Sequence, residues 1–241
     1  MRYNTIAIVG PSTSGKTDAA LEIARSNNGG LVCCDVLQMY NGFKIGSGTP
    51  SPTETEGIPT TLYGYLHPGD DYFPHDAYVP LAAKSRRDFT SKGILPIFEG
   101  RSSNYVRLLM ENPPAEELGE IPVFGLFQSS NGLNDKLRSR LNKMFDEGIV
   151  EEINQLLDEG MGKTLPMRAG IIYKSLVPYV LGNRSYQDAV DYTIRRWEKC
   201  FHKQLRVFSE MEGITPIDVD LSHPEQTVEK LETLISEGVP V

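Results

Sequence analysis

The chain has few of the features that mark secreted, membrane-spanning or zinc-binding proteins. It has three cysteines in 241 residues, the adjacent Cys33 and Cys34 and the distant Cys200. Three cysteines are too few for a disulfide framework, and none has the C-x-x-C spacing of a zinc site. No apolar run approaches the ~20 residues that a membrane-spanning helix needs, and the first residues lack the pattern of a signal peptide. We therefore expect a cytoplasmic protein with reduced thiols and no membrane partner.

An excess of positive charge is also absent. The 24 lysines and arginines are outnumbered by 32 aspartates and glutamates, which gives a net charge of −8. Proteins that bind a long nucleic acid through its backbone usually carry a basic face. The composition therefore disfavours a nucleic-acid partner, although it leaves room for a local basic patch. Hydrophobic residues make up 39% of the chain, which is enough for a sizeable core.

Short apolar runs alternate with segments of helical periodicity. The pattern predicts strands at residues 5–10, 29–35, 94–99, 121–127 and 214–220. It predicts helices at residues 16–28, at 81–93 after Pro80, and at 133–148, 149–160, 165–182, 185–213 and 224–238. Such alternation is typical of an α/β fold, here a P-loop NTPase-like parallel sheet flanked by helices, with a helical C-terminal elaboration. We expect a P-loop core at 1–132, the elaboration at 133–211, and a returning strand and closing helix at 212–241.

The segment "GPSTSGKT" lies between the first predicted strand and the first predicted helix. It fits G-x-x-x-x-G-K-[ST] at every required position. Its backbone N–H groups and the helix N-terminus would surround a diphosphate or triphosphate. The lysine adds a charge at the phosphate oxygens, and the final threonine hydroxyl is a candidate Mg²⁺ ligand. The predicted phosphate-binding residues are Gly10, Pro11, Ser12, Thr13, Ser14, Gly15, Lys16 and Thr17, with Thr17 at the metal.

A second constellation begins at Asp35, where the second predicted strand ends. In open α/β sheets this edge is where ligands bind. A carboxylate there could position Mg²⁺ or act as a general base, and it could also simply cap a turn or helix. Residues 40–75 are rich in Gly, Pro and Thr, and we expect them to form a long irregular binding loop. A P-loop kinase of a small metabolite is an alternative, because the arginines within residues 84–89 and 194–199 could cover a transferred phosphate.

The P-loop and the segment "CDVLQMYNGFKIGSGTP" together resemble the isopentenyltransferase family, which prenylates the N6 amine of adenine. Later segments resemble the same family in the same order, so the similarity covers most of residues 5–208. The matching residues of the second segment are Asp35, Gln38, Tyr40, Gly42, Ile45, Gly46 and Pro50. The loop alone is common, but the loop followed by this segment is specific.

The resemblance implies a choice between two acceptors. The family's tRNA enzymes insert a helical domain before the segment that begins here at Arg140, and the short stretch after Met110 leaves no room for it. Short members resemble adenylate isopentenyltransferases, which make cytokinin precursors. We therefore expect an adenine nucleotide (AMP, ADP or ATP) as acceptor. A minimal enzyme acting on tRNA is the nearest alternative.

The resemblance also implies roles for individual residues. Dimethylallyl diphosphate would lie in the P-loop with Mg²⁺, so that the loop and Lys16 stabilise the departing diphosphate. Asp35 would accept the hydrogen of the acceptor amine, and Ser12 stands where most members have threonine. Gln38 and Ser47 would lie beside the acceptor nucleotide.

Several residues depart from the family pattern. Arg101 stands where a second glycine is usual, and Thr49 replaces a basic residue. Ile172 and Asn142 replace a glycine and an aspartate of the later segments. Because a guanidinium suits phosphate oxygens, we expect Arg101 to compensate for Thr49 by binding phosphate. The departures also leave open a catalytically weakened nucleotide-binding regulator.

Overall fold

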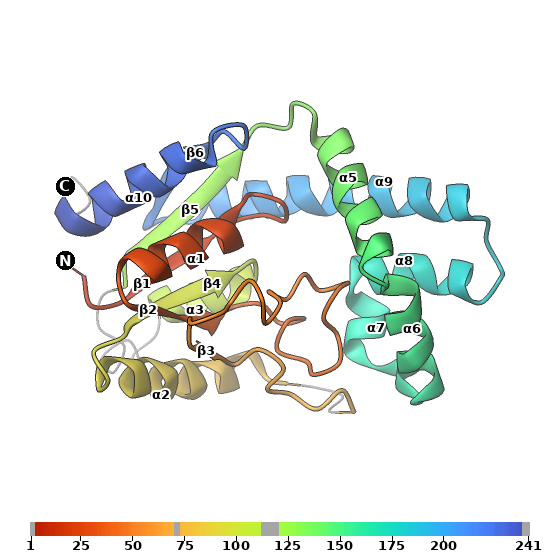
Figure 1. The fold of residues 1–241 in the computed structure, drawn as a ribbon, viewed down its shortest axis with the longest axis horizontal. Coiled ribbons are helices and arrows are strands. Elements are labelled where there is room, and N and C mark those ends of the chain that lie inside the picture. The colour runs from red at the N-terminus through yellow and green to blue at the C-terminus, as the bar shows by residue number, and fades with distance from the viewer. Residues whose placement is uncertain (1–2, 70–72, 112–120, 238–241) are drawn as a thin grey trace.

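A six-stranded, wholly parallel sheet forms the centre of the computed structural model, which describes residues 3–69, 73–111 and 121–237 (Figure 1). The strand order is β3-β2-β4-β1-β5-β6. The strands are β1 (Ile6–Val9), β2 (Gly29–Cys33), β3 (Thr60–Thr61), β4 (Leu95–Gly100), β5 (Val123–Gln128) and β6 (Ile214–Val219). The predicted α/β fold with a parallel sheet is confirmed.

The central strands are buried on both faces, as parallel sheets require. Every residue of β1 is fully buried, and it pairs with β4 on one side and β5 on the other. Its side chains alternate, so that Ile6 and Ile8 enter one apolar cluster and Ala7 and Val9 enter the other. The sequence has continuous apolar runs here because both faces of each strand need apolar side chains.

Helices cover both faces of the sheet. On one face, α1 (Lys16–Ser26) and α10 (Pro224–Glu237) contribute to a cluster of buried residues with the sheet. On the other face, α2 (Tyr78–Thr90), α3 (Ser103–Glu111) and α9 (Tyr186–Ser209) contribute to a larger cluster. The sheet therefore lies between two helical layers.

The segment after β5 folds into helices beyond the carboxyl edge of the sheet (Figure 1). They are α5 (Leu133–Asp146), α6 (Ile149–Asp158), α7 (Leu165–Ala169) and α8 (Ile171–Val180), followed by the long α9. Two short 3₁₀ turns, η1 (His75–Ala77) and η2 (Met161–Lys163), complete the elements. The larger apolar cluster runs from β1 to Phe201 of α9, so the sheet and these helices share one core.

Three details differ from the predicted elements. Helix α2 begins at Tyr78, two residues before Pro80, because proline is tolerated in a first helical turn, where its missing N–H has no helical partner. The predicted helix at 165–182 is broken at Gly170, which adopts an extended conformation between α7 and α8. Helix α3 was not predicted. Within the predicted loop of residues 40–75, the described residues 40–69 and 73–74 are irregular as expected, apart from β3 and an isolated bridge between Tyr40 and Leu66.

In the described part of the chain, no helix is both long and apolar enough to cross a membrane.

Candidate functional site

The predicted phosphate-binding loop connects β1 to the N-terminus of α1, as its flanking pattern indicated. Gly10 and Gly15 have φ values of 153° and 75°, which L side chains rarely adopt. A Cβ atom at Gly10 would also lie 2.5 Å from the backbone oxygen of Leu126. The two glycines therefore allow the loop to curl against β5, while the first N–H groups of α1 lack helical partners and remain available for an anion.

Lys16 is buried at the base of this loop. Its Nζ lies 3.4 Å from the backbone oxygen of Pro11. Burial lowers the pKa of Lys16 from 10.5 to about 8; the nearby Glu99 raises it, and the positive charges of Arg101 and Arg140 lower it further. Several cations thus converge on one loop, and a bound polyanion would offset their mutual repulsion.

A buried glutamate, which was not predicted from the sequence, lies beside Thr17. The Thr17 hydroxyl donates to Glu99 Oε1 at 2.9 Å, and the Tyr63 hydroxyl donates to Glu99 Oε2 at 2.9 Å. Glu99 is fully buried in β4, opposite Ile8 of β1. A signal was available, because a carboxylate that ends an otherwise apolar strand in a parallel sheet is costly unless it has a partner or ligand.

Asp35 lies just beyond β2, close to the loop, as predicted. Its Oδ1 accepts the backbone N–H of Leu37 at 2.9 Å, and its Oδ2 lies 2.7 Å from Arg101 Nε. The carboxylate is 3% exposed. The structure therefore shows both a turn-capping contact, the structural alternative for this residue, and a position at the ligand-binding edge.

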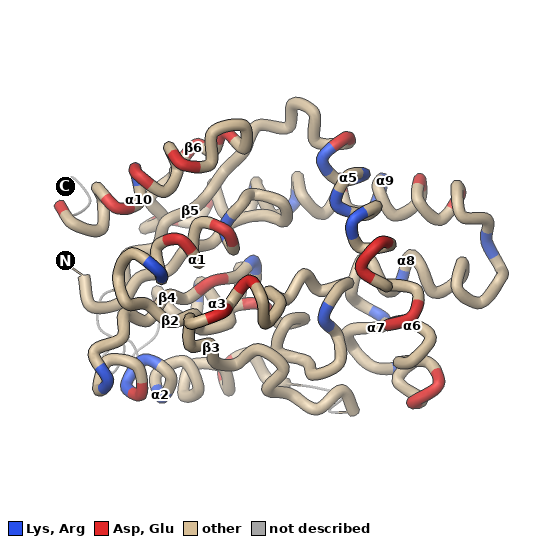
Figure 2. Tube along the Cα trace, in the orientation of Figure 1, with Lys and Arg blue, Asp and Glu red and all other residues tan. Residues whose placement is uncertain are grey.

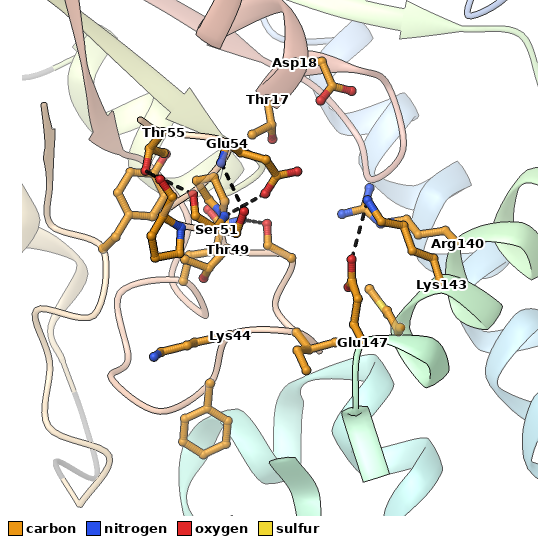
Figure 3. Close-up of a pocket in the computed structure, with 18 of the residues that line it drawn as sticks. Thr17, Asp18, Lys44, Thr49, Ser51, Glu54, Thr55, Arg140, Lys143 and Glu147 are labelled. Atoms are coloured by element: carbon orange, nitrogen blue, oxygen red, sulfur yellow. Dashed lines mark hydrogen bonds and ion pairs between the residues drawn. The ribbon is translucent and has the colours of Figure 1, made fainter. Parts of the chain in front are cut away.

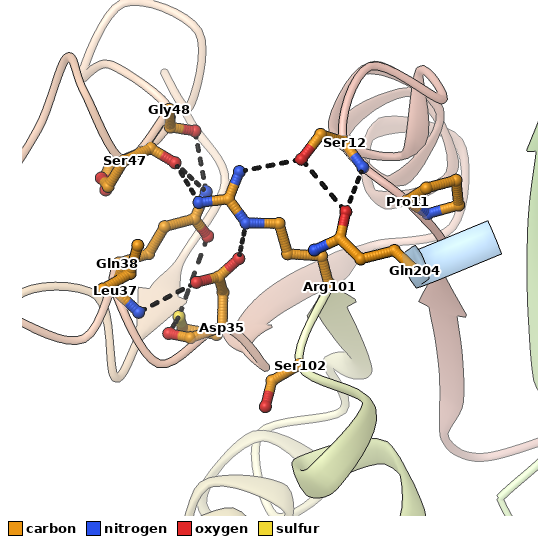
Figure 4. Close-up of polar contacts among 12 residues, drawn as sticks. Pro11, Ser12, Asp35, Leu37, Gln38, Ser47, Gly48, Arg101, Ser102 and Gln204 are labelled. Carbon is orange, nitrogen blue, oxygen red and sulfur yellow. Dashed lines mark hydrogen bonds and ion pairs between the residues drawn. The ribbon is translucent and has the colours of Figure 1, made fainter. Parts of the chain in front are cut away.

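Arg101 connects three parts of the site (Figure 4). Besides Asp35, its Nη1 donates to the Ser12 hydroxyl at 3.3 Å, and its Nη2 donates to the backbone oxygen of Ser47 at 3.2 Å. Ser12 is in turn held by Gln204 of α9, whose Oε1 accepts the Ser12 N–H at 3.1 Å. The predicted contact of Arg101 with phosphate stays a prediction.

The predicted acceptor residues Gln38 and Ser47 make contacts within their own loop. Gln38 Nε2 donates to the Gly48 backbone oxygen at 2.8 Å, and the Ser47 hydroxyl donates to the Phe43 oxygen at 2.6 Å. Thr49 Oγ1 lies 2.8 Å from the Ser47 hydroxyl oxygen. These contacts order the loop beside Asp35, and the role of the two residues toward an acceptor stays a prediction.

Glu152 of α6 holds the same loop from outside. Its carboxylate accepts the N–H groups of Lys44, Ile45 and Gly46 at 3.0, 2.8 and 3.2 Å. It also accepts the Tyr173 hydroxyl at 2.7 Å. Such charge-assisted bonds are among the strong ones in proteins, so the helical region determines the position of the loop that carries Ser47.

Two cavities meet at this site. The larger, about 1320 Å³, is lined by the phosphate-binding loop, residues of the 38–64 region and α5. Arg140 and Lys143 project into it from α5, with Lys143 Nζ 3.5 Å from Glu147 Oε1 (Figure 3). The smaller cavity, about 140 Å³, shares Arg140 and Met144 with the larger one and is lined largely by apolar side chains. Arg140 lies over the Trp197 ring at 5.9 Å and lines both cavities.

Among the described residues, no group of three or more His, Cys, Asp or Glu side chains could form a metal site by itself. Thr17 and Glu99 nevertheless offer two adjacent oxygens, as Mg²⁺ prefers. Mg²⁺ is commonly held by one or two protein oxygens together with substrate phosphates. The residues present therefore fit a magnesium ion that arrives with a diphosphate.

Curated proteins with similar sequences include tRNA dimethylallyltransferases. The chain is 25% identical to a tRNA dimethylallyltransferase of Acetivibrio thermocellus, over 90% of this chain and 92% of the relative. It is 28% identical to that of Streptococcus gordonii, over 89% and 92%. The expectation that adenylate isopentenyltransferases are the best match is therefore not supported. These alignments also give no evidence of a missing domain; the stretch between Met110 and Arg140 includes residues 112–120, which lie outside the described residues.

Solved structures share the fold. A tRNA delta(2)-isopentenylpyrophosphate transferase of Staphylococcus epidermidis superposes with a TM-score of 0.85 at 21% identity, covering 98% of this chain and 99% of that one. A tRNA isopentenylpyrophosphate transferase of Bacillus halodurans gives a TM-score of 0.82 at 21% identity, covering 97% and 96%.

Family models match most of the chain. The isopentenyl transferase model matches residues 3–67, and the IPP transferase model matches residues 38–121 and 111–211. The two models cover the phosphate-binding loop, Asp35, Arg101 and the helices of the C-terminal region. The predicted resemblance to isopentenyltransferases is confirmed at this level: the chain belongs to the IPP transferase family.

Proposed function

We propose that this protein transfers a dimethylallyl group from dimethylallyl diphosphate to the N6 amine of an adenine in tRNA. The observation that carries the proposal is the joining of a phosphate-binding loop to Asp35 through Ser12 and Arg101, at one edge of the sheet. The tRNA-modifying relatives, which match about nine tenths of the chain, favour tRNA over the free adenine nucleotide expected from the sequence.

Local positive charge supports a polyanionic acceptor despite the net charge of −8. Lysines and arginines recur along α5, which borders the larger cavity (Figure 2). Lys136, Arg140 and Lys143 of this helix and Lys44 of the loop line that cavity. With Lys16 they outnumber the three acids that line the same cavity, Asp18, Glu54 and Glu147. Such a local excess of positive charge suits phosphate backbones.

The reaction breaks one bond and forms another. The C–O bond of the allylic diphosphate breaks, and a C–N bond forms between the allyl carbon and the adenine amine. The diphosphate keeps the electron pair of the broken bond, and the N–H groups of the loop and Lys16 stabilise its charge. The proton leaves the amine for Asp35, whose carboxylate is the proposed base.

Magnesium would be held by Thr17 and Glu99 together with diphosphate oxygens. When bound, the ion would neutralise charge on the leaving group. Glu99 would serve this role while Tyr63 holds its other oxygen.

The smaller cavity supplies a place for the five-carbon group. Its walls include Met144, Ile171, Ile172 and Trp197, and Ser12 of the phosphate-binding loop lies at its border. An apolar wall next to the diphosphate site would shield the allylic carbon from water. In this proposal Ile172, which departs from the family glycine, narrows that cavity.

The proposal is tested by the mass of the product. Purified protein is incubated with Mg²⁺ and dimethylallyl diphosphate, and separately with unmodified tRNA, AMP, ADP and ATP. We expect tRNA to gain one C₅H₈ unit on an adenosine after nuclease digestion. A gain on AMP, ADP or ATP without a gain on tRNA would instead establish the free-nucleotide reaction.

Two variants test whether product formation depends on Asp35. Asp35→Asn keeps the size of the side chain but removes the base, and its rate should fall by about 10²–10⁴-fold. Arg107→Gln changes an exposed residue of α3 and should leave the rate unchanged. The proposal would be contradicted if no acceptor gained C₅H₈ although the protein is folded and still binds diphosphate. That result would favour a catalytically weakened nucleotide-binding regulator.

A further inference from the structure

The Asp35 carboxylate is closed off in this structure. Its Oδ2 is buried and lies 2.7 Å from Arg101 Nε, and its Oδ1 accepts the Leu37 N–H. Arg101 is itself only 18% exposed at its side chain. An incoming amine therefore cannot reach Asp35 until the guanidinium moves.

Arg101 already contacts the loop where a diphosphate would bind. Its Nη1 already contacts Ser12, a residue of the phosphate-binding loop. The same guanidinium carries five N–H donors in a fork that suits phosphate oxygens as well as carboxylates. A diphosphate in the loop would therefore compete with Asp35 for Arg101.

Charge favours the exchange once a diphosphate is bound. Lys16, Arg101 and Arg140 influence one another electrostatically around the loop. The nearby acids are Glu99 and Asp35 beside Lys16, and Asp18, Glu99 and Glu147 beside Arg140. In the absence of an anion, Asp35 is the strongest partner that Arg101 contacts. A bound diphosphate brings several negative charges within reach and changes this balance.

We propose that Arg101 is a positioning residue that locks Asp35 until the donor's diphosphate binds, so that donor binding opens the base to the acceptor amine. This rests on the proposed function for the role of Asp35. The lock enforces an order in which the donor binds first, and it protects the base from unproductive contact with acceptor or water. Arg101 thus acts through Asp35 in addition to any contact with phosphate.

The lock predicts that Asp35 and Arg101 are coupled in their effects on diphosphate binding. This coupling can be measured without turnover. Calorimetry gives the Kd for inorganic diphosphate with Mg²⁺ in the wild type, Asp35→Asn, Arg101→Gln and the double variant. Asp35→Asn releases Arg101, so diphosphate should bind about 5-fold more tightly or better. In the Arg101→Gln background the same Asp35→Asn change should alter the Kd by less than about twofold.

The double variant separates the lock from simple charge removal. If only the loss of the Asp35 charge mattered, Asp35→Asn would lower the Kd for diphosphate equally in the wild-type and Arg101→Gln backgrounds. Equal effects on the Kd would therefore overturn the proposal. Arg107→Gln is the matched control, because it removes an exposed guanidinium of α3 and should leave the Kd unchanged.

A second measurement uses only the wild-type protein, in case a variant does not fold. The Kd of the acceptor that gains C₅H₈ in the product assay is compared with and without saturating Mg²⁺-diphosphate. The lock predicts that diphosphate tightens acceptor binding about 5-fold or more. Unchanged or weakened binding would overturn it. Product formation without this coupling would leave the proposed function intact while removing the lock, so the two failures are distinguishable.

Discussion

The phosphate-binding loop and the Asp35 side of the site are built in opposite ways. The loop is eight consecutive residues between one strand and one helix, and its lysine contacts a residue five positions earlier. The Asp35 side joins Asp35, Arg101, Ser12 and Gln204, and the contact between Ser12 and Gln204 spans 192 positions. If the proposed function is correct, binding of the leaving group depends on local sequence, whereas control of the base depends on the tertiary fold.

The largest effect should come from the loop itself. Lys16→Met should lower kcat/KM by about 10²–10³-fold or more, because it removes a charge aimed at the departing diphosphate. Diphosphate binding by calorimetry should be lost in parallel. A variant that retained near-normal turnover would show that the loop does not hold the leaving group.

The same substitution should stabilise the fold. Because burial lowers the pKa of Lys16 to about 8, the folded state binds its proton less readily than the unfolded state. Lys16 therefore costs stability at neutral pH, and the cost is relieved as pH rises from about 8 to 10.5. Lys16→Met should raise Tm at pH 7 by roughly 2–4 °C or more, and a lower Tm by calorimetry would contradict this.

The next largest effect tests the tertiary contacts that hold the Asp35 side of the site. Glu152→Gln places an amide N–H₂ near the N–H groups of residues 44–46 and removes the charge from their bonds. We expect a loss of about 1.5–3 kcal/mol in urea unfolding and a higher KM for the acceptor. Glu151→Gln, the exposed neighbour on α6, should change neither quantity. A rise in the KM for the donor alone would show that the loop of residues 44–46 contacts the donor and not the acceptor.

The loop also predicts a pH dependence. Above about pH 8, a growing fraction of Lys16 in the free protein is neutral and offers no charge to an anion. The affinity for Mg²⁺-diphosphate should fall between pH 7 and pH 9 by up to about tenfold. Any affinity that remains in Lys16→Met should lack this component, and an identical pH profile in both proteins would assign the titration elsewhere.

The smallest effect should come from the hydrogen bond between Tyr63 and Glu99, the proposed magnesium ligand. Tyr63→Phe removes the hydroxyl that donates to Glu99 Oε2 and should cost about 1 kcal/mol of stability. The concentration of Mg²⁺ that gives half-maximal rate should rise modestly, while the KM for the acceptor stays the same. An unchanged Mg²⁺ dependence of the rate would show that Glu99 is not a ligand of the metal.

The sequence was sufficient where a feature depends on neighbouring residues. The strands at 5–10 and 94–99 and the loop at 10–17 follow from apolar runs, glycines and the G-x-x-x-x-G-K-T pattern. Glu99 and Glu152 were not predicted. The apolar strand around Glu99 indicates that it needs a partner, but the neighbouring residues do not reveal that this partner is Thr17, or that Glu152 will lie beside the N–H groups of residues 44–46.

The short stretch after Met110 led us to expect a free adenine nucleotide as acceptor, and the tRNA-modifying relatives do not support that expectation. The overall charge also disfavoured a nucleic acid. The net charge of −8 describes the whole surface, whereas Lys136, Arg140 and Lys143 gather on one helix beside the cavity. The sequence predicts phosphate as a partner of Arg101, and that contact stays a prediction. In the structure its nearest charged partner is Asp35, which only the packing of β4 beside β2 could reveal.

One competition experiment tests the central claim most directly. Unmodified tRNA and AMP are mixed at concentrations that give equal amounts of acceptor adenine, and limiting dimethylallyl diphosphate is added with Mg²⁺ and wild-type protein. The proposed function predicts that the C₅H₈ unit is recovered on tRNA adenosine, with Arg107→Gln giving the same distribution. Recovery on AMP alone would contradict the assignment of tRNA as the acceptor.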